Sequence, residues 1–233
     1  MIIPAYNEEL NIKNSVEKII NYNKKSKHNI DYIVINDGST DKTADICKKN
    51  NYNTINLINN LGIGGSVQTG YKYAFINDYD VAIQFDGDGQ HDENYIDSLV
   101  KEIENGADFV IGSRFIENLS NFKSTNTRRF GIKILSFLIY MCTNRRIYDP
   151  TSGFRAANKQ IIEYFSRHYP IEYPEPESTV DLIRNHYTIK EVAVEMHERK
   201  YGQSSIKPLK SIYYMFSVSI SILITSIRRG GKR

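Results

Sequence analysis

Short runs of strand-forming residues alternate with amphipathic segments of helix length through the first half of this 233-residue chain. Asp31–Asn36 and Tyr79–Phe85 are apolar runs of strand length, whereas Asn11–Tyr22 and Asn94–Glu104 repeat their apolar residues at helical spacing. Such alternation predicts βαβ units and a mainly parallel sheet with helices on its faces. Ligands of these sheets bind where the strands end, so the residues after each strand are the candidates for a functional site. The other predicted elements of this half are the strands Met1–Pro4, Asn53–Ile58 and Asp108–Gly112 and the helices Asp41–Lys49 and Gly64–Asn77.

The regular alternation ends after Gly112. The second half contains a turn-rich segment, Asp149–Arg155, and one more predicted strand, Lys190–Met196. Its predicted helices are Arg128–Thr143, Lys159–Arg167, Ser178–Tyr187 and Ser211–Ile227.

The two halves of the chain carry opposite charge. Residues 1–113 contain no arginine and have a net charge of −7, whereas residues 114–233 contain all the arginines and have a net charge of +10. Carboxylates bind hard metal ions, and guanidinium groups bind phosphate and carboxylate in a bidentate way. We interpret the two halves as parts of one site for an anionic substrate, with ordinary solvated surface as the alternative.

A glycine-rich acidic segment, Asp86-Gly87-Asp88-Gly89-Gln90-His91, follows the predicted strand Tyr79–Phe85. Two carboxylates one residue apart, with glycine between them, can converge on one hard cation. A calcium loop of the EF-hand type is excluded, because it needs glycine at the sixth position, where His91 stands. The alternative is an acidic turn that caps the next helix through Asp92.

Three further segments follow or adjoin predicted strands. In Asn36–Asp41, Asp37 can accept a hydrogen bond from the base or ribose of a nucleotide, although a capped turn is the alternative. In Pro4–Glu8, Tyr6 offers a stacking face and Glu8 an acceptor; the alternative is a helix start with Asn7 as N-cap. Leu61–Ser66 matches neither the dinucleotide fingerprint nor the P-loop, and we expect it to pack a helix closely on the sheet.

Taken together, these segments closely resemble the family 2 glycosyltransferases of the GT-A fold. The resemblance covers about the first 205 residues, and the nearest branch looks like the polyprenyl-phosphate sugar transferases, which include the dolichol-phosphate mannose synthases. The matching segments are Pro4–Glu8, Asn36–Asp41, Asn60–Gly65, Asp86–Asp92, Gly112–Arg114, Asp149–Arg155 and Glu198–Ser205.

The resemblance implies an inverting enzyme that uses a nucleotide-diphosphate sugar and a divalent metal, Mg²⁺ or Mn²⁺. By position, the nucleotide would be held by Pro4, Ala5, Tyr6, Glu8, Asp37 and Asp86. The metal would be held by Asp86, Asp88 and Gln90, and Asp88 also counts as catalytic. The diphosphate would be bound by Arg199, Ser204 and Ser205. A metal ion and arginine would stabilise the charge that develops on the leaving diphosphate.

The acceptor side is less fixed. A sugar hydroxyl of a cell-surface glycan needs a base, for which Glu177 is the first candidate and Glu175 the second, although both acids would also suit a helix N-terminus. A polyprenyl phosphate is already anionic and needs a cationic guide instead. The residues predicted for the acceptor side are Arg128, Arg129, Asp149 and Arg155, and an internal salt bridge would explain the last two equally well.

The chain ends in an apolar helix, Ser211–Ile227, with basic residues on both sides. It is too short to span a bilayer, which predicts a helix that lies on an anionic membrane surface, or that binds a membrane-protein partner or a second subunit. Packing on its own domain is the alternative. We therefore predict a GT-A domain over residues 1–206 and a membrane- or partner-associating segment over residues 207–233.

Several broader expectations follow. With no signal peptide and no disulfide framework, we expect a cytoplasmic protein that is peripheral at the inner face of the cell membrane, with no nucleic-acid partner and with a homo-oligomer as an option. Two other functions are weighed. A sugar-1-phosphate nucleotidyltransferase would need a glycine-rich basic loop after the first strand, where Asn7, Glu8 and Glu9 stand. An inactive transferase-like subunit that recruits a membrane partner is the third hypothesis.

Overall fold

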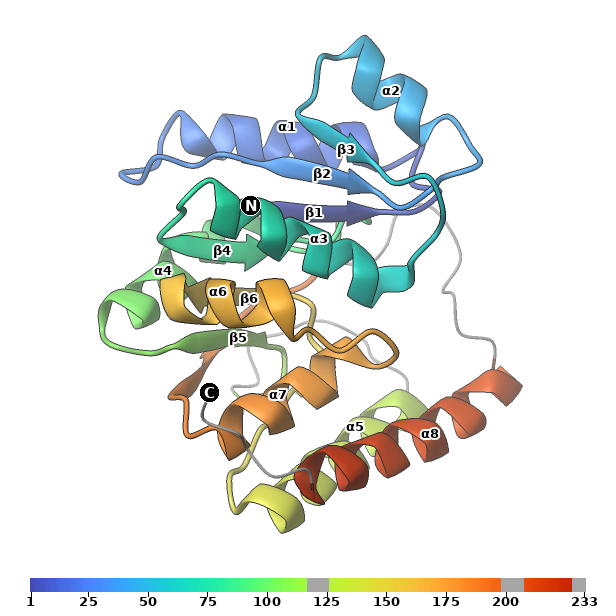
Figure 1. Ribbon diagram of the computed structural model, residues 1–233, viewed down its shortest axis with the longest axis vertical. Helices are drawn as coiled ribbons and strands as arrows, with labels where there is room; N and C mark the ends of the chain where they lie inside the picture. Colours follow the sequence, from blue (N-terminus) through green and yellow to red (C-terminus); the bar gives the residue numbers. More distant parts are fainter. Residues whose placement is uncertain (117–125, 198–207, 228–233) are drawn as a thin grey trace.

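A seven-stranded sheet organises the molecule (Figure 1). The structure is a computed structural model that describes residues 1–116, 126–197 and 208–227. The strand order is β3-β2-β1-β4-β6-β5-β7, and only β6, which pairs with β4 and β5, runs antiparallel to its neighbours. The mainly parallel sheet predicted from the sequence is therefore confirmed. The strands are β1 Ile2–Ala5, β2 Ile33–Asn36, β3 Thr54–Asn56, β4 Val81–Gln84, β5 Phe109–Ser113, β6 Arg155–Asn158 and β7 Ile189–Ala193.

Helices cover both faces of this sheet. In Figure 1, α3 and α6 lie in front of it and α1 and α4 behind it, while α5, α7 and α8 gather beyond β5. The helices are α1 Ile12–Asn23, α2 Thr43–Lys49, α3 Gly62–Ile76, α4 Ile96–Glu104, α5 Asn126–Thr143, α6 Lys159–Arg167, α7 Pro174–Arg184 and α8 Pro208–Ile227.

The strands divide their side chains between two apolar cores. Ile33 and Ile35 of β2 face the core under α3 and α6, and Val34 faces the core under α1 and α4. Ile2 and Ile3 of β1 divide in the same way. Because successive side chains of a strand point to opposite faces, a strand that is buried on both sides reads as a continuous apolar run.

Two expectations for the second half are corrected. The predicted turn Asp149–Arg155 leads directly into an unpredicted strand, β6, which lies between β4 and β5. The predicted helix Ser178–Tyr187 begins earlier, because α7 starts at Pro174, and its last described helical residue is Arg184. Proline fits the first turn of a helix, where the backbone N–H has no intrahelical partner in any case.

The glycines of α3 allow two close contacts. A Cβ on Gly70 would lie 2.2 Å from the side chain of Ile2 in β1, and the Ser66 hydroxyl donates to the Ile35 carbonyl at 3.4 Å. Within the segment Leu61–Ser66, the Ser66 hydrogen bond is the close helix–sheet packing that the sequence predicted. A Cβ on Gly64, however, would lie 2.4 Å from the Ile171 carbonyl oxygen, so this glycine contacts the loop before α7 instead of the sheet.

The last helix, α8, is partly built into the domain. Val218 and Ile222 are fully buried in the same core as Leu135 and Ile139 of α5. Within the part of the chain that the structure describes, no helix combines the length and the hydropathy needed to cross a membrane. The predicted division at residue 206 stays a prediction.

Candidate active site

The loops that follow β1, β2 and β4 are joined at one edge of the sheet. Ala5 and Asn36 are in register at the ends of β1 and β2, and the N–H of Asp37 donates to the Ala5 carbonyl at 2.9 Å. The N–H of Gly87 donates to the Pro4 carbonyl at 3.3 Å. The structure therefore brings together the three strand-end segments that the sequence analysis singled out.

Asp37 lies at the base of this edge and is 3% exposed. Its Oδ1 accepts from the Leu61 N–H at 2.7 Å, which ties the end of β2 to the start of α3. Burial raises the pKa of Asp37, while the backbone N–H groups of Leu61 and Gly62 act in the opposite direction. Asp37 thus stabilises the connection between the end of β2 and the start of α3. Its contact with a nucleotide stays a prediction.

The loop after β1 is fixed by the loop after β2. Asn7 has a left-handed backbone (φ 55°), and its Oδ1 accepts from the N–H groups of Thr40 and Asp41 at 2.8 and 3.3 Å. Since α1 begins only at Ile12, the alternative in which Asn7 is the N-cap of that helix is wrong. Tyr6, which precedes Asn7, is 47% exposed, so its ring is accessible for stacking.

Asp86 is held on both carboxylate oxygens. Gln84 donates from Nε2 to Oδ1 at 3.0 Å, and the His91 Nε2 lies 3.0 Å from Oδ2. A Cβ on Gly153 would lie 2.5 Å from Oδ2, so only glycine leaves room for the carboxylate there. No role was predicted for Gln84; the available signal was a glutamine within an apolar strand. The His91 ring stacks on Phe154.

Gln90 connects the acidic loop to the segment after β7. The Oδ1 of Asp88 accepts from the Gln90 N–H at 3.0 Å. Gln90 donates from Nε2 to the His197 carbonyl at 3.3 Å and accepts from the His197 N–H at 2.8 Å. The expected cap is also present, because Asp92 accepts from the Asn94 N–H at 2.9 Å.

These donors fit a hard divalent cation that the substrate helps to bind. Asp86 and Asp88 are two carboxylates on one glycine-containing loop, and Gln90 adds an amide oxygen. Among the described residues, no group of three or more His, Cys, Asp or Glu side chains could hold a metal ion. Mg²⁺ in particular binds through one or two carboxylates and takes further oxygens from substrate phosphates and water. The loop suits such a shared site better than a closed structural one.

The two candidate bases lie in the first turn of α7. Burial raises the pKa of Glu175; the Arg155 guanidinium opposes this rise, and the Asp86 carboxylate adds to it. The Glu175 and Asp86 carboxylates thus interact electrostatically. Glu177, the first candidate from the sequence, is half-buried, and its N–H donates to the Tyr173 carbonyl at 3.2 Å. Both assignments stay predictions.

Asp149 and Arg155, predicted for the acceptor side, are fully buried. Asp149 forms a bidentate ion pair with Arg114, with distances of 2.6 Å from Nε and 2.7 Å from Nη2. Arg155 donates to the carbonyl groups of Ser152, Pro150 and Glu175. For Asp149, the alternative explanation, an internal salt bridge, is the one that the structure shows, with Arg114 as the partner. Both side chains fix the shape of the loop between α5 and β6.

The other predicted site residues are less closely defined. Arg129 is exposed on α5, and Arg128 belongs to the first turn of that helix. Arg199, Ser204 and Ser205 lie outside the residues that the structure describes.

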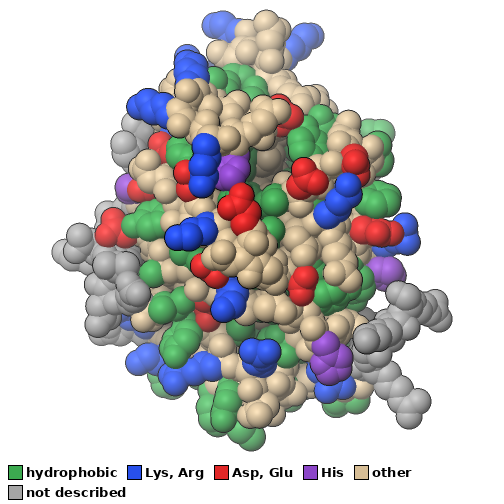
Figure 2. Space-filling view, turned by 90° about the vertical axis from the view of Figure 1, so that its left-hand side faces the viewer, with side chains coloured by type: hydrophobic (Ala, Val, Ile, Leu, Met, Phe, Trp, Pro, Cys, Tyr) green, Lys and Arg blue, Asp and Glu red, His purple; other side chains and the backbone are tan. Residues whose placement is uncertain are grey.

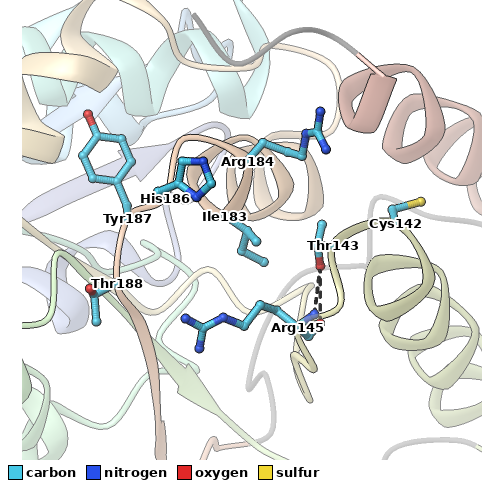
Figure 3. Close-up of a pocket in the computed structure, with 8 residues that line it drawn as sticks. All are labelled: Cys142, Thr143, Arg145, Ile183, Arg184, His186, Tyr187 and Thr188. Atoms are coloured by element: carbon cyan, nitrogen blue, oxygen red, sulfur yellow. Dashed lines mark hydrogen bonds between the residues drawn. The ribbon is translucent and has the colours of Figure 1, made fainter. Parts of the chain in front are cut away.

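A separate cavity of about 570 Å³ lies at the amino end of β7, at the opposite edge of the sheet from Asp86 (Figure 3). Arg145, Arg184 and His186 contribute to its lining. The side chains of Arg145 and Arg184 extend away from each other in Figure 3, so they do not converge on one ligand. Figure 2 shows the face at the amino ends of the strands, where acidic and basic side chains are interspersed.

Solved structures of low sequence identity share this fold. Glucosyl-3-phosphoglycerate synthase from Mycobacterium tuberculosis, in complex with phosphoglyceric acid, matches with a TM-score of 0.68 and 18% identity, over 98% of this chain and 78% of that one. The same enzyme with Mn²⁺ and uridine-diphosphate-glucose matches with a TM-score of 0.66 and 17% identity, over 96% of this chain and 77% of that one. The predicted GT-A fold is confirmed.

Curated relatives match over almost the whole chain. The UDP-N-acetylglucosamine–dolichyl-phosphate N-acetylglucosaminyltransferase of Methanococcus voltae is 33% identical over 94% of this chain and 87% of its own length. The polyprenol monophosphomannose synthase of Mycolicibacterium smegmatis is 24% identical over 94% of this chain and 84% of its own length. The family model described as glycosyl transferase family 2 matches residues 1–165, and the chain belongs to this family.

Proposed function

We propose that the protein transfers a sugar from a nucleotide-diphosphate sugar to a polyprenyl phosphate, with inversion at the anomeric carbon. The observation that carries the proposal is the placement of Asp86 and Asp88 after β4, joined to the loops after β1 and β2. The names of the relatives from Methanococcus voltae and Mycolicibacterium smegmatis, which both act on polyprenyl or dolichyl phosphates, support the acceptor class.

The donor would bind across the carboxyl ends of β1, β2 and β4. Tyr6 would stack on the base, Asp37 would accept from the nucleotide, and Asp86, Asp88 and Gln90 would hold Mg²⁺ or Mn²⁺. When bound, the cation supplies charge stabilisation for the departing diphosphate. The protein contributes a rigid arrangement of oxygen donors, so little reorganisation is needed when the donor binds.

A phosphate acceptor needs a cationic guide more than it needs a base that removes a proton. A phosphate monoester has a second pKa of about 6 and is largely dianionic at pH 7. The exposed Arg129 and Lys133 on α5 would steer this anion toward the sugar. If the acceptor were a glycan hydroxyl, Glu175 or Glu177 would have to act as the base.

The surface of α5 and α8 suits a peripheral membrane location. Large apolar side chains are exposed on both helices, and neither helix contains an acidic residue. The exposed apolar residues are Phe130, Ile134, Phe137, Tyr140 and Met141 on α5 and Phe216, Ile220, Leu223, Ile224 and Ile227 on α8; we call this set the α5–α8 apolar face. A lipid surface would bring the polyprenyl chain to the enzyme.

The test is a donor and acceptor panel. The purified protein is incubated with Mn²⁺, each of several nucleotide sugars, and either a polyprenyl phosphate or the corresponding polyprenol, and nucleotide release is followed. We expect release with one donor and with the phosphate only, and a loss of at least 100-fold in Asp88→Ala. The inactive-subunit alternative predicts no release from any donor, and equal activity of Asp88→Ala and wild type would reject the proposed site.

A further inference from the structure

Two buried side chains, Gln84 and His91, each place one nitrogen atom within hydrogen-bond distance of Asp86. Gln84 is 0% exposed and His91 is 2% exposed. Their Nε2 atoms lie 3.0 Å from Oδ1 and Oδ2 of the Asp86 carboxylate, respectively. Because an ionised carboxylate only accepts hydrogen bonds, both nitrogens donate. The carboxylate is therefore held on both oxygens by groups that solvent does not reach.

The other polar atom of each side chain has no partner. Gln84 Oε1 and His91 Nδ1 are buried and make no hydrogen bond within the part of the chain that the structure describes. A buried polar atom without a partner costs stability, so each such case requires an explanation. An apolar residue at either position would avoid this cost, but it would release one oxygen of Asp86.

Packing fixes the two donors in place. The His91 ring stacks on Phe154 with centroids 4.9 Å apart and planes inclined by 25°, and it meets the Phe85 ring edge-on at 5.5 Å. Gln84 is the last residue of β4 and is paired with Arg155 of β6, so its backbone is part of the sheet. Neither donor can move without disturbing the core.

We propose that Gln84 and His91 are positioning residues that hold the Asp86 carboxylate in its metal-binding orientation before the cation and the donor arrive. The inference rests on the proposed function, because it takes Asp86 as a metal ligand. Partners that orient a ligating carboxylate typically change metal affinity 10- to 100-fold when they are replaced. The orphaned atoms are then a stability cost that is retained for function.

Three variants separate positioning from packing. Gln84→Leu removes the donor and also the orphaned acceptor, and His91→Phe keeps an aromatic ring between Phe85 and Phe154 without its nitrogen atoms. His91→Gln restores a donor, because the glutamine Nε2 can reach about as far as the histidine Nε2. Tyr71→Phe is the matched control, since it removes another buried atom without a partner, the Tyr71 hydroxyl, that does not contact Asp86.

The readout is Mn²⁺ affinity by titration calorimetry in the presence of UDP or GDP, whichever binds the wild type, together with the melting temperature. We expect Gln84→Leu and His91→Phe to bind Mn²⁺ 10- to 100-fold more weakly and His91→Gln to recover most of the loss. Gln84→Leu should melt at or above the wild-type temperature, and Tyr71→Phe should bind Mn²⁺ as the wild type does.

The outcomes distinguish this inference from the proposed function. If the wild type binds no Mn²⁺ with either nucleotide, the proposed function fails. If the wild type binds Mn²⁺, Asp88→Ala loses it and Gln84→Leu binds as tightly as the wild type, the positioning role is overturned. A fall in melting temperature without a change in Mn²⁺ affinity would likewise assign both residues to packing alone.

Discussion

At the scale of single residues, the best-defined interaction beside the candidate site is the buried ion pair between Arg114 and Asp149. The pair is bidentate, and both side chains are at most 4% exposed. Burial alone would raise the pKa of Asp149, but the Arg114 guanidinium outweighs it and holds that pKa below the usual range. Removing one partner would leave the other as an uncompensated buried charge.

We therefore predict that Asp149→Ala lowers the free energy of unfolding by about 3–5 kcal/mol at pH 7. Because the folded-state pKa of Asp149 is depressed, its contribution is present above the unfolded-state value of about 3.9 and is lost as the pH falls below it. Urea unfolding at pH 7 and at pH 3.5 checks this, with a smaller difference expected at pH 3.5. The double variant Asp149→Leu/Arg114→Met is the control and should recover part of the loss; no recovery would argue against an unpaired charge as the cause.

For Glu175 we predict the opposite dependence of stability on pH. Its pKa is raised by burial and by Asp86, so the charged form is disfavoured in the folded state. The folded protein therefore loses stability as the pH rises above the unfolded-state pKa of about 4.3. Glu175→Gln keeps the shape and removes the charge, and it should raise the free energy of unfolding by about 1 kcal/mol at pH 7. Urea unfolding at pH 4 should show a smaller gain, and equal gains at both pH values would contradict the charge as the cause.

The sequence predicted the positions of the site residues better than their partners. Asp37, Asp86 and Asp88 follow parallel strands, and the edge at which such strands end is a property of the fold class. The partner of Asp149 is Arg114, which is 35 positions away in the chain. Which two distant side chains meet depends on how the strands pair, and one sequence does not contain that information.

At the scale of elements, the first half was predictable and β6 was not. The predicted strands and helices up to β5 all exist, because each carries its own periodic pattern. β6 is only the four residues Arg-Ala-Ala-Asn, with no β-branched or aromatic residue, and its first three residues are buried. Its stability comes from pairing with β4 and β5, which are distant in the chain, so no local signal marks it.

Gly64, at the start of α3, and Gly131, in α5, are a matched pair of helical glycines. A Cβ on Gly64 would lie 2.4 Å from the backbone oxygen of Ile171, whereas one on Gly131 in α5 would lie 3.1 Å from the flexible Met215 side chain. Backbone atoms before α7 would have to move in Gly64→Ala, which should cost about 1–3 kcal/mol. Gly131→Ala should be neutral or stabilising by up to about 1 kcal/mol, since alanine favours helix.

Chemical denaturation of the two alanine variants measures this difference. Because α7 follows directly after the displaced loop and carries Glu175, Gly64→Ala should also lower glycosyl transfer, while Gly131→Ala should not. Similar free energies of unfolding for both variants would show that the loop before α7 yields easily and does not fix the helix.

At the scale of the whole molecule, the α5–α8 apolar face lies on elements that also build the core. Val218 and Ile222 of α8 are buried against the domain, while Phe216 is 66% exposed and Phe137 of α5 is 60% exposed. Because α5 and α8 contact each other, we interpret these exposed apolar side chains as one binding surface. From the sequence alone, membrane association was predicted for the last helix. The structure adds α5 to this surface, because the sequence pattern of α5 does not reveal where that helix packs.

Membrane binding should therefore depend on both helices and on anionic lipid. Phe137→Ser and Phe216→Ser remove apolar area from α5 and α8 without touching the buried residues, and each should weaken vesicle binding about 10-fold, since burying one such ring is worth about 1.5–3 kcal/mol. The double variant should bind about 100-fold more weakly, because separate contacts add.

Ile76→Ser, at the end of α3, is the control: Ile76 is 78% exposed and lies outside the face, so its replacement should leave binding unchanged. Co-sedimentation with vesicles of anionic or zwitterionic lipid measures all four, and weaker binding to zwitterionic vesicles is expected from the basic residues Arg129 and Lys133. If Phe216→Ser abolished binding while Phe137→Ser bound like the wild type, the membrane contact would belong to α8 alone.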